Sequence, residues 1–322
     1  KTWESPGLRE KAPRGRWGDA LLHVSDCAIH RQCTRADVVR NPVEGRPVTS
    51  PVVLASFRPA LVGADLDGTL IGRDLAWADG TPEALAGLRA VGVRTVICTG
   101  RMLQSARRMA ERLGIAAGPV ICYQGALVAD LAGGEWWRHV PMDGETAAEV
   151  VRHVTAMGCQ INAYIDDELC VEEVTRWARR YAEHVEVAIE TVPDLEAAVR
   201  RRPPTKLVLV TATEQADEIL PGLQQRWHGR LYVVRSQPEY IEFVDLSVSK
   251  SGALAWLCER LGVAREQVAT MGDGMNDVDM LRWAGLGVAV AEAAAPVRAA
   301  ADLVVPRADI PALLRELAER AS

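Results

Sequence analysis

"ALVGADLDGTLIG", residues 60–72, joins an apolar run to two aspartates and a glycine. The apolar residues from Leu61 to Leu66 predict a buried strand. Side chains two positions apart on a strand point to the same side, so we expect Asp65 and Asp67 to face the same way where the strand ends. An Asp-Gly pair alone most often marks a turn, so the meaning of this segment depends on the rest of the chain.

The chain on either side of this segment alternates between strand-like and helix-like patterns. We expect a helix over 81–92, a strand ending at Thr99, a helix over 105–113, a strand with a hairpin over 118–130, a strand, Gly-rich turn and helix over 267–285, a strand over 286–290 and a helix over 310–320. Strands that alternate with amphipathic helices are typical of parallel sheets. The pattern predicts an α/β fold with a doubly wound, Rossmann-like parallel sheet.

The middle of the chain predicts a second domain. Residues 141–240 show their own alternation of short strands and helices, and a segment of about 100 residues is long enough for a separate small core. We therefore divide the chain into a core formed by 58–140 and 241–322, an inserted α/β domain over 141–240, and an N-terminal extension over 1–57.

The extension differs in composition from the remainder. Residues 1–58 hold ten Lys and Arg against six Asp and Glu, which leaves 27 against 37 for the other residues. Pro, Gly and Arg are frequent, so we expect mostly irregular structure with one short helix near 19–39. Because the chain begins with Lys and not Met, we expect a fragment or a misplaced start.

The expected helix of the extension carries four side chains that can bind zinc, namely His23, Cys27, His30 and Cys33. Their spacings of 4, 3 and 3 place most of them along one helical face, whereas structural zinc sites usually take two ligands from each of two segments. A zinc site is therefore the less favoured interpretation, and elemental analysis would test it.

The overall composition excludes several classes of protein. The 322 residues are 48% hydrophobic and 25% charged, with a net charge of −6. An acidic body argues against nucleic acid as the main ligand. No apolar run approaches the roughly 18 residues of a membrane span, and no signal peptide begins the chain, so we expect a cytoplasmic protein without a membrane partner. Seven scattered cysteines favour reduced thiols. The oligomeric state is not readable.

Polar residues follow three of the expected strands. Open parallel sheets bind ligands at the carboxyl ends of their strands. We therefore expect Asp65 and Asp67 to meet Asp273 and Asp277 in one crevice. Two charges about 4 Å apart repel by roughly 4 kcal/mol at an effective dielectric near 20, so four carboxylates require a compensating cation. Carboxylates and phosphate oxygens suit Mg²⁺, which predicts a magnesium and phosphate site.

Other known motifs fit the same residues less well. "GDGMND" at 272–277 resembles a dinucleotide fingerprint, but Asp277 stands where the last glycine belongs and would repel a pyrophosphate. An EF-hand needs glycine at loop position six, and counting from Asp65 places Leu70 there. No Walker A pattern occurs. Taken alone, "VICTG" at 96–100 fits a strand ending in a helix cap, and Lys250 fits a surface lysine.

Four motifs in order carry a family resemblance. "DLDGT" (65–69), "CTGR" (98–101), "SVSKSGAL" (247–254) and "GDGMNDVDML" (272–281) resemble the motifs of the haloacid dehalogenase-like hydrolases. The inserted domain is similar to the α/β cap of the Cof-type branch, whose members are phosphatases. The resemblance covers residues 60–320.

The resemblance implies a role for each motif residue. Asp65 would be the nucleophile that forms an aspartyl-phosphate, and Asp67 would be the acid and base. The remaining residues would bind the phosphate or hold the loops that bind it: Gly68, Thr69, Thr99, Gly100, Arg101, Lys250 and Asn276. Mg²⁺ would be held by the side chains of Asp65, Asp273 and Asp277 and by the backbone carbonyl of Asp67.

Three residues bear on how far the resemblance extends. Gln124 stands where this branch usually shows Asn, and Glu292 stands in a segment that is usually Gly-Asn-Ala, so an acidic group near the crevice would alter substrate preference. Lys206 competes with Lys250 for the cationic role, but it precedes a strand of the inserted domain. Lys250 fits the motif better.

The function predicted from the sequence is hydrolysis of a small phosphorylated metabolite, with Mg²⁺ as cofactor. Sugar phosphates, pyridoxal phosphate, flavin mononucleotide and nucleotides all stay open as substrates. A phosphomutase or phosphotransferase is the closest enzymatic alternative, since it shares the aspartyl-phosphate and differs in the acceptor. A non-catalytic protein that binds phosphorylated metabolites is the alternative outside enzymes. Release of free phosphate would separate them.

Overall fold

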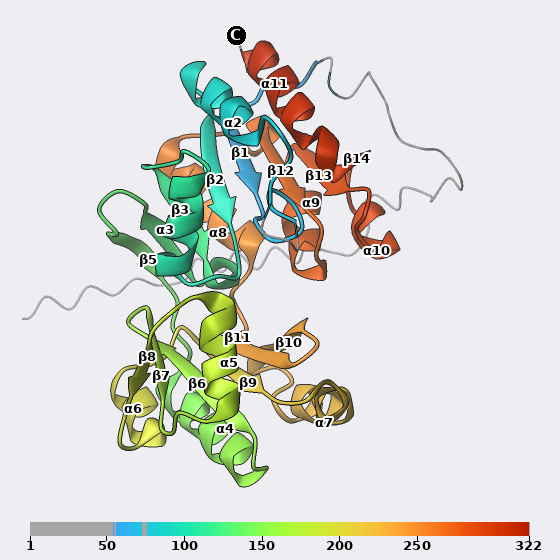
Figure 1. Cartoon of the computed structure of the whole chain (residues 1–322). Coiled ribbons are helices and arrows are strands. Elements are labelled where there is room, and N and C mark those ends of the chain that lie inside the picture. The colour runs from blue at the N-terminus through green and yellow to red at the C-terminus, as the bar shows by residue number, and fades with distance from the viewer. Residues whose placement is uncertain (1–53, 55, 73–75, 322) are drawn as a thin grey trace, which may run out of the picture. The chain divides into compact units, whose positions relative to one another are not determined.

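The structure is a computed structural model that describes residues 54, 56–72 and 76–321. The expected helix near 19–39 and the four zinc-type ligands of the extension lie outside the described residues. Two β-sheets, each covered by helices, contain the strands of the described chain (Figure 1).

The first sheet has eight strands in the order β14-β13-β12-β1-β2-β3-β4-β5. These strands are β1 (Leu61–Ala64), β2 (Arg94–Cys98), β3 (Pro119–Cys122), β4 (Leu127–Asp130), β5 (Trp136–His139), β12 (Val268–Gly272), β13 (Leu286–Val290) and β14 (Leu303–Val305). Neighbours from β14 to β3 are parallel, and β4 and β5 continue the sheet antiparallel. The predicted α/β fold with a parallel sheet is confirmed.

Helices cover both faces of this sheet (Figure 1). The helices are α2 (Thr81–Ala90), α3 (Leu103–Arg112), α8 (Lys250–Leu261), α9 (Val278–Trp283), α10 (Ala295–Arg298) and α11 (Ile310–Ala321). Leu61 of β1 packs in a cluster with α8 and α9, whereas Val62 and Ala64 pack with α2, α3 and α11. Because successive strand side chains point to opposite faces, an apolar β1 supplies both cores.

The start of α8 places a cation at the sheet. The side chain of Ser249 accepts a hydrogen bond of 3.0 Å from the backbone N–H of Gly252, which caps the helix. Lys250 is therefore the first residue of α8. Gly262 ends the helix in the left-handed region at φ 66°.

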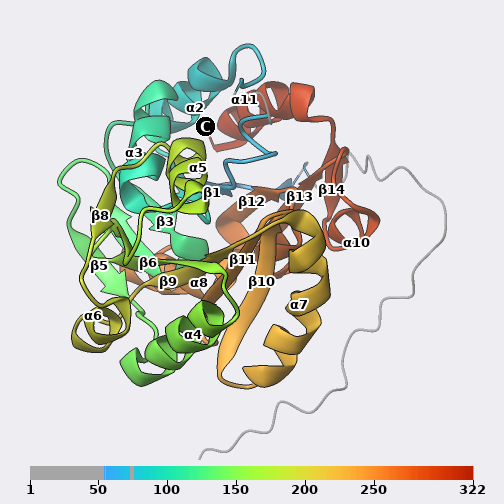
Figure 2. The ribbon, with the colours of Figure 1, turned by 60° about the horizontal axis from the view of Figure 1, so that its bottom comes forward.

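The second sheet has six strands in the order β10-β11-β9-β6-β7-β8. They are β6 (Gln160–Ile165), β7 (Glu168–Val171), β8 (Ile189–Thr191), β9 (Lys206–Val210), β10 (Leu231–Gln237) and β11 (Tyr240–Asp245), and the helices are α4 (Gly144–Ala156), α5 (Arg176–Val185), α6 (Leu195–Arg201) and α7 (Thr213–Arg226). Helices α4, α6 and α7 cover one face (Figure 2). The other face packs with α5 and contributes to the core of the first sheet.

Three strands were not expected from the sequence. β5 extends the hairpin that follows β3, and β14 has three residues. β11 pairs with both β9 and β10, so residues 240–245 belong to the second sheet, although the prediction ended the inserted domain at 240. The division into a core, an inserted domain and an N-terminal extension, with the boundaries given above, stays a prediction.

Two expectations drawn from the composition concern the cysteines and membrane-spanning helices. Cys98, Cys122, Cys159, Cys170 and Cys258, the cysteines among the described residues, are free thiols. Among the helices that the structure describes, none combines the length and apolar character that a membrane crossing requires. The cytoplasmic location stays a prediction.

Candidate active site

The proposed site residues lie where three adjacent strands end. β1 pairs in parallel with β12 on one side and β2 on the other. Asp65 follows β1, Thr99 follows β2 and Asp273 follows β12. The convergence expected from the strand ends is therefore present, because parallel neighbours end at the same edge of the sheet.

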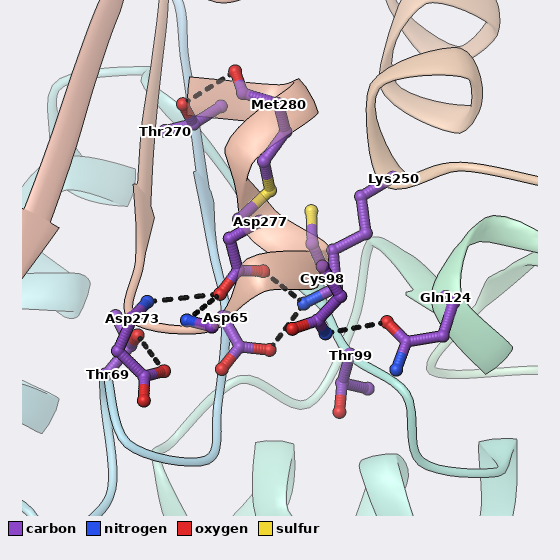
Figure 3. Close-up of polar contacts among 12 residues, drawn as sticks. Asp65, Thr69, Cys98, Thr99, Gln124, Lys250, Thr270, Asp273, Asp277 and Met280 are labelled. Atoms are coloured by element: carbon purple, nitrogen blue, oxygen red, sulfur yellow. Dashed lines mark hydrogen bonds and ion pairs between the residues drawn. The ribbon is translucent and has the colours of Figure 1, made fainter. Parts of the chain in front are cut away.

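Three carboxylates form one cluster. Asp65, Asp273 and Asp277 each offer an oxygen, and these oxygens lie within 4.8 Å of one another (Figure 3). Asp277 accepts hydrogen bonds from the backbone N–H groups of Asp273 (3.0 Å) and Gly274 (2.8 Å). The hydroxyl of Thr69 donates to Asp273 at 3.1 Å. Backbone and hydroxyl donors thus fix two of the three carboxylates in place.

Gly68 allows this close packing. Its φ of +93° lies in the left-handed region, and a Cβ at this position would lie 2.1 Å from Oδ2 of Asp273. Only glycine meets both conditions, since any other side chain would be strained and would strike the carboxylate. The glycine of "DLDGT" therefore lets the loop after β1 approach Asp273.

Lys250 bridges two of the carboxylates. Its Nζ lies 2.6 Å from Oδ1 of Asp65 and 2.6 Å from Oδ1 of Asp277, and its side chain is fully buried (Figure 3). Burial alone would lower the pKa of Lys250, but the carboxylates of Asp277 and Asp65 outweigh burial and raise it. The ammonium group is therefore held in its charged form.

The carboxylates hold more negative charge than Lys250 neutralises. Burial raises the pKa of Asp65 well above its usual value, against the opposing effect of Lys250. Burial and the neighbouring Asp277 raise the pKa of Asp273 to about 6. Three carboxylates around one ammonium group leave an excess of two charges when all are ionised. A divalent cation fits this donor set, because it supplies the missing charge and prefers oxygen ligands.

The carboxylate of Asp67 does not belong to this cluster and pairs with Arg101. Its two carboxylate oxygens accept hydrogen bonds from Nε (2.7 Å) and Nη2 (2.6 Å) of Arg101, and its side chain is 45% exposed. The strand ends alone led us to expect four carboxylates in one crevice, whereas the structure groups three. The family resemblance implied that Asp67 would bind the ion through its backbone carbonyl, which stays a prediction. A bidentate pairing with Arg101 turns the fourth carboxylate toward the loop after β2.

The loop after β2 brings together the predicted phosphate contacts. Thr99 is buried, and its Oγ1 accepts a hydrogen bond of 3.1 Å from the backbone N–H of Arg101. A Cβ on Gly100 would lie 2.3 Å from Nε2 of Gln124. Asn276 donates its Nδ2 to Oε1 of Gln124 at 2.9 Å. The structure therefore connects Asn276 to Gln124, and the predicted role of Asn276 at the phosphate stays a prediction.

Two residues are closer to the site than the sequence indicated. Gln124, seen only as a departure from the family, adopts φ 60° and links the loop after β2 to Asn276. Lys206, set aside as a residue of the inserted domain, places Nζ 3.1 Å from the carbonyl oxygen of Gly100. The sequence signal that could have identified Lys206 is its place as a charged residue at the start of the apolar run "KLVLV". Glu292 instead accepts from the backbone N–H of Arg307.

Comparisons with known proteins agree with this geometry. Residues 62–317 match the family described as haloacid dehalogenase-like hydrolase. A phosphoglycolate phosphatase of Archaeoglobus fulgidus is 30% identical over 253 residues, which are 79% of this chain and 93% of that protein. A 5-amino-6-(5-phospho-D-ribitylamino)uracil phosphatase of Bacillus subtilis is 27% identical over 246 residues, 76% of this chain and 88% of that protein. A crystal structure from Thermotoga maritima has a TM-score of 0.73 at 30% identity and covers 82% of this chain and 98% of its own. The chain therefore belongs to the haloacid dehalogenase-like hydrolases, in the Cof-type branch that its inserted domain predicted.

Proposed function

We propose that this hydrolase is a Mg²⁺-dependent phosphatase that cleaves small phosphomonoesters through an aspartyl-phosphate. The observation that carries the proposal is the position of Asp65. Its carboxylate is buried, lies 2.6 Å from Nζ of Lys250 and belongs to the three-carboxylate cluster. The phosphatase names of the relatives bear out the predicted enzyme class, a hydrolase of phosphoric monoesters.

In the proposed first step, an oxygen of Asp65 attacks phosphorus in line with the leaving oxygen. The Asp65–phosphorus bond forms as the bond to the leaving alcohol breaks, and that alcohol takes a proton from Asp67. In the second step, water gives a proton to Asp67 and attacks phosphorus, which releases phosphate and restores the Asp65 carboxylate. Since Arg101 occupies both oxygens of Asp67, at least one of these hydrogen bonds has to open for the proton to move.

Fixed positive charge would stabilise the transferred phosphoryl group. Lys250 lies beside the nucleophile. The oxygen of Thr99 accepts from the backbone N–H of Arg101, and its hydroxyl proton would be donated to a phosphate oxygen. Asp65, Asp273 and Asp277, with the backbone carbonyl of Asp67, would hold Mg²⁺. A bound Mg²⁺ offsets charge on the phosphoryl oxygens.

The proposed substrate is a small metabolite in which the phosphate esterifies an alcohol. Two relatives are phosphatases of phosphoglycolate and of a phosphorylated ribityl compound. The substrates in both names are small phosphomonoesters, which supports this class of substrate. Sugar phosphates, pyridoxal phosphate, flavin mononucleotide and nucleotides belong in the same test set.

The experiment is a panel of phosphomonoesters assayed for released inorganic phosphate with Mg²⁺ and with a chelator. We expect release that depends on Mg²⁺, and Asp65→Asn should lower it by about 10³-fold or more. Asp79→Asn, at an exposed carboxylate before α2, is the matched control and should keep the activity. Acid-quenched samples should contain a phosphorylated peptide that includes Asp65. Full activity in Asp65→Asn would disprove the nucleophile, and phosphate moved to a second alcohol without release would favour a phosphotransferase.

A further inference from the structure

Lys206 is a buried charge in the second sheet. It is the first residue of β9, and its Nζ lies 3.1 Å from Oε1 of Glu242 on the adjacent strand β11. The two side chains are 4% and 7% exposed. The other carboxylate oxygen of Glu242 is buried and has no hydrogen-bond partner within the described part of the chain.

Fold stability is a poor explanation for this pair. Removing two charges from water costs more than their attraction returns unless every remaining polar atom is satisfied. Glu242 leaves one oxygen unsatisfied, so the pair is incompletely compensated. Replacing a buried ion pair by apolar side chains of similar volume is often neutral or stabilising.

Lys206 also contacts the first sheet. Its Nζ donates to the carbonyl oxygen of Gly100 at 3.1 Å, across 106 positions of sequence. That carbonyl belongs to the same peptide group as the N–H of Arg101, which donates to Oγ1 of Thr99 at 3.1 Å. One peptide group is therefore held at its oxygen by Lys206 and at its nitrogen by Thr99.

The planarity of the peptide group connects these two contacts. Because the group is rigid, fixing the direction of the Gly100 carbonyl also fixes the direction of the Arg101 N–H. This N–H uses an acceptor position on the Thr99 oxygen, so the hydroxyl proton of Thr99 points elsewhere. In the proposed function, that proton binds a phosphate oxygen.

We propose that Lys206 is a positioning residue for the phosphate site. Together with Glu242, it fixes the Gly100–Arg101 peptide and thereby aims the hydroxyl of Thr99, although Lys206 itself contacts no phosphate. The loop after β2, which contains Thr99 and Gly100, is then fixed by contacts from the second sheet as well as by the first. This inference rests on the proposed function, because it takes the Thr99 hydroxyl to be a phosphate ligand.

Two variants separate positioning from folding. Lys206→Met removes the donor to Gly100 and keeps a long aliphatic side chain, but it leaves Glu242 unpaired. The double variant Lys206→Met with Glu242→Leu removes both charges, so the sheet is not left with a buried unpaired carboxylate. Lys206→Arg keeps a donor and tests for rescue. Arg230→Met, which breaks an exposed ion pair between the turn before β10 and Glu149 of α4, is the matched control.

The measurements are the inhibition constant of inorganic phosphate, the KM and kcat for the best substrate of the panel, and backbone hydrogen exchange over residues 99–104. We expect the phosphate constant and KM to rise about ten-fold or more in Lys206→Met and in the double variant, as for a lost charged hydrogen bond. Lys206→Arg should recover part of the loss. Exchange at 99–104 should accelerate in the two Met variants and stay unchanged in Arg230→Met.

Two results would overturn the proposal. One is an unchanged phosphate constant in Lys206→Met. The other is a wild-type constant in the double variant, because the effect of Lys206→Met would then come from the unpaired Glu242 and not from Gly100. A wild-type protein that releases no phosphate from any substrate would instead count against the proposed function. Faster exchange at 99–104 would still be expected in that case if Lys206 fixes the loop.

Discussion

Replacing Lys250 by Met should destabilise the protein and make its stability depend steeply on pH. Lys250 is fully buried and serves two carboxylates at 2.6 Å, whose side chains are 8% and 1% exposed. Removing one partner of a buried ion pair costs about 3–5 kcal/mol, since a charge is left without compensation. Here two carboxylates, Asp65 and Asp277, are left facing each other, so we expect the upper part of that range at neutral pH.

The expected change is large enough for a thermal unfolding assay. At about 2–4 °C per kcal/mol, a cost of about 4–5 kcal/mol should lower the Tm of Lys250→Met at pH 7.5 in a chelator by roughly 8–20 °C. The exposed pair of Arg230 and Glu149 supplies the control, because Arg230→Met should cost less than about 1 kcal/mol. Phosphatase activity should be lost in Lys250→Met and kept in Arg230→Met.

The pH dependence tests the cause of the destabilisation. Burial raises the pKa of Asp65, and removal of Lys250 takes away the group that opposes this rise. The unpaired carboxyl therefore takes up a proton as the pH falls, and the repulsion with Asp277 declines. The difference in Tm between wild type and Lys250→Met should narrow between pH 7.5 and pH 5. Two results would refute the reasoning. One is a Tm of Lys250→Met within about 2 °C of wild type at pH 7.5, which corresponds to a cost of roughly 1 kcal/mol or less. The other is a difference in Tm between the two proteins that becomes larger as the pH falls.

Three further predictions concern the same site. Gly68→Ala should abolish activity and lower the Tm, because its Cβ would lie 2.1 Å from Asp273 at φ +93°; a variant with normal kinetics would contradict this packing. Burial and Asp277 raise the pKa of Asp273 from 3.8 to about 6. The folded metal-free protein then binds this proton more tightly than the unfolded chain, so the contribution of Asp273 to stability should decline as the pH rises from about 4 to 6. Asp273→Asn should remove that decline in Tm, and Mg²⁺ should raise the Tm of the wild type, but not of Asp273→Asn, at pH 7.5. Gln124→Ala should raise KM more than it lowers kcat, since Gln124 packs on Gly100 and accepts from Asn276; steady-state kinetics with Gln124→Asn as the conservative variant would check it.

The sequence predicted the segments of the site because their chemistry is local. A strand that ends in Asp65, a strand that ends at Thr99 and a Gly-rich turn before Asp277 each combine an apolar run with a polar residue type, and such patterns are readable over a few residues. The parallel order of the strands then follows from the alternation with helices. The family resemblance rested on the same segments.

Local sequence patterns did not predict the short strands or the contacts between the two sheets. β14 has three residues, and β11 is defined by its pairing with β9 and β10. A run as short as β14 carries little periodic signal, and pairing depends on partners far away in sequence. The sequence analysis therefore did not predict β11 as a strand of the second sheet.

The amino-acid sequence by itself determined which carboxylates and which hydroxyl follow β1, β2 and β12, because strand periodicity and turn residues act over neighbouring positions. Tertiary structure alone decided that the side chain of Asp67 pairs with Arg101, that Gln124 supports Asn276, and that Lys206 reaches Gly100. Each of these contacts depends on how two distant segments pack, since side-chain direction and spacing across the chain are set only when both cores are formed.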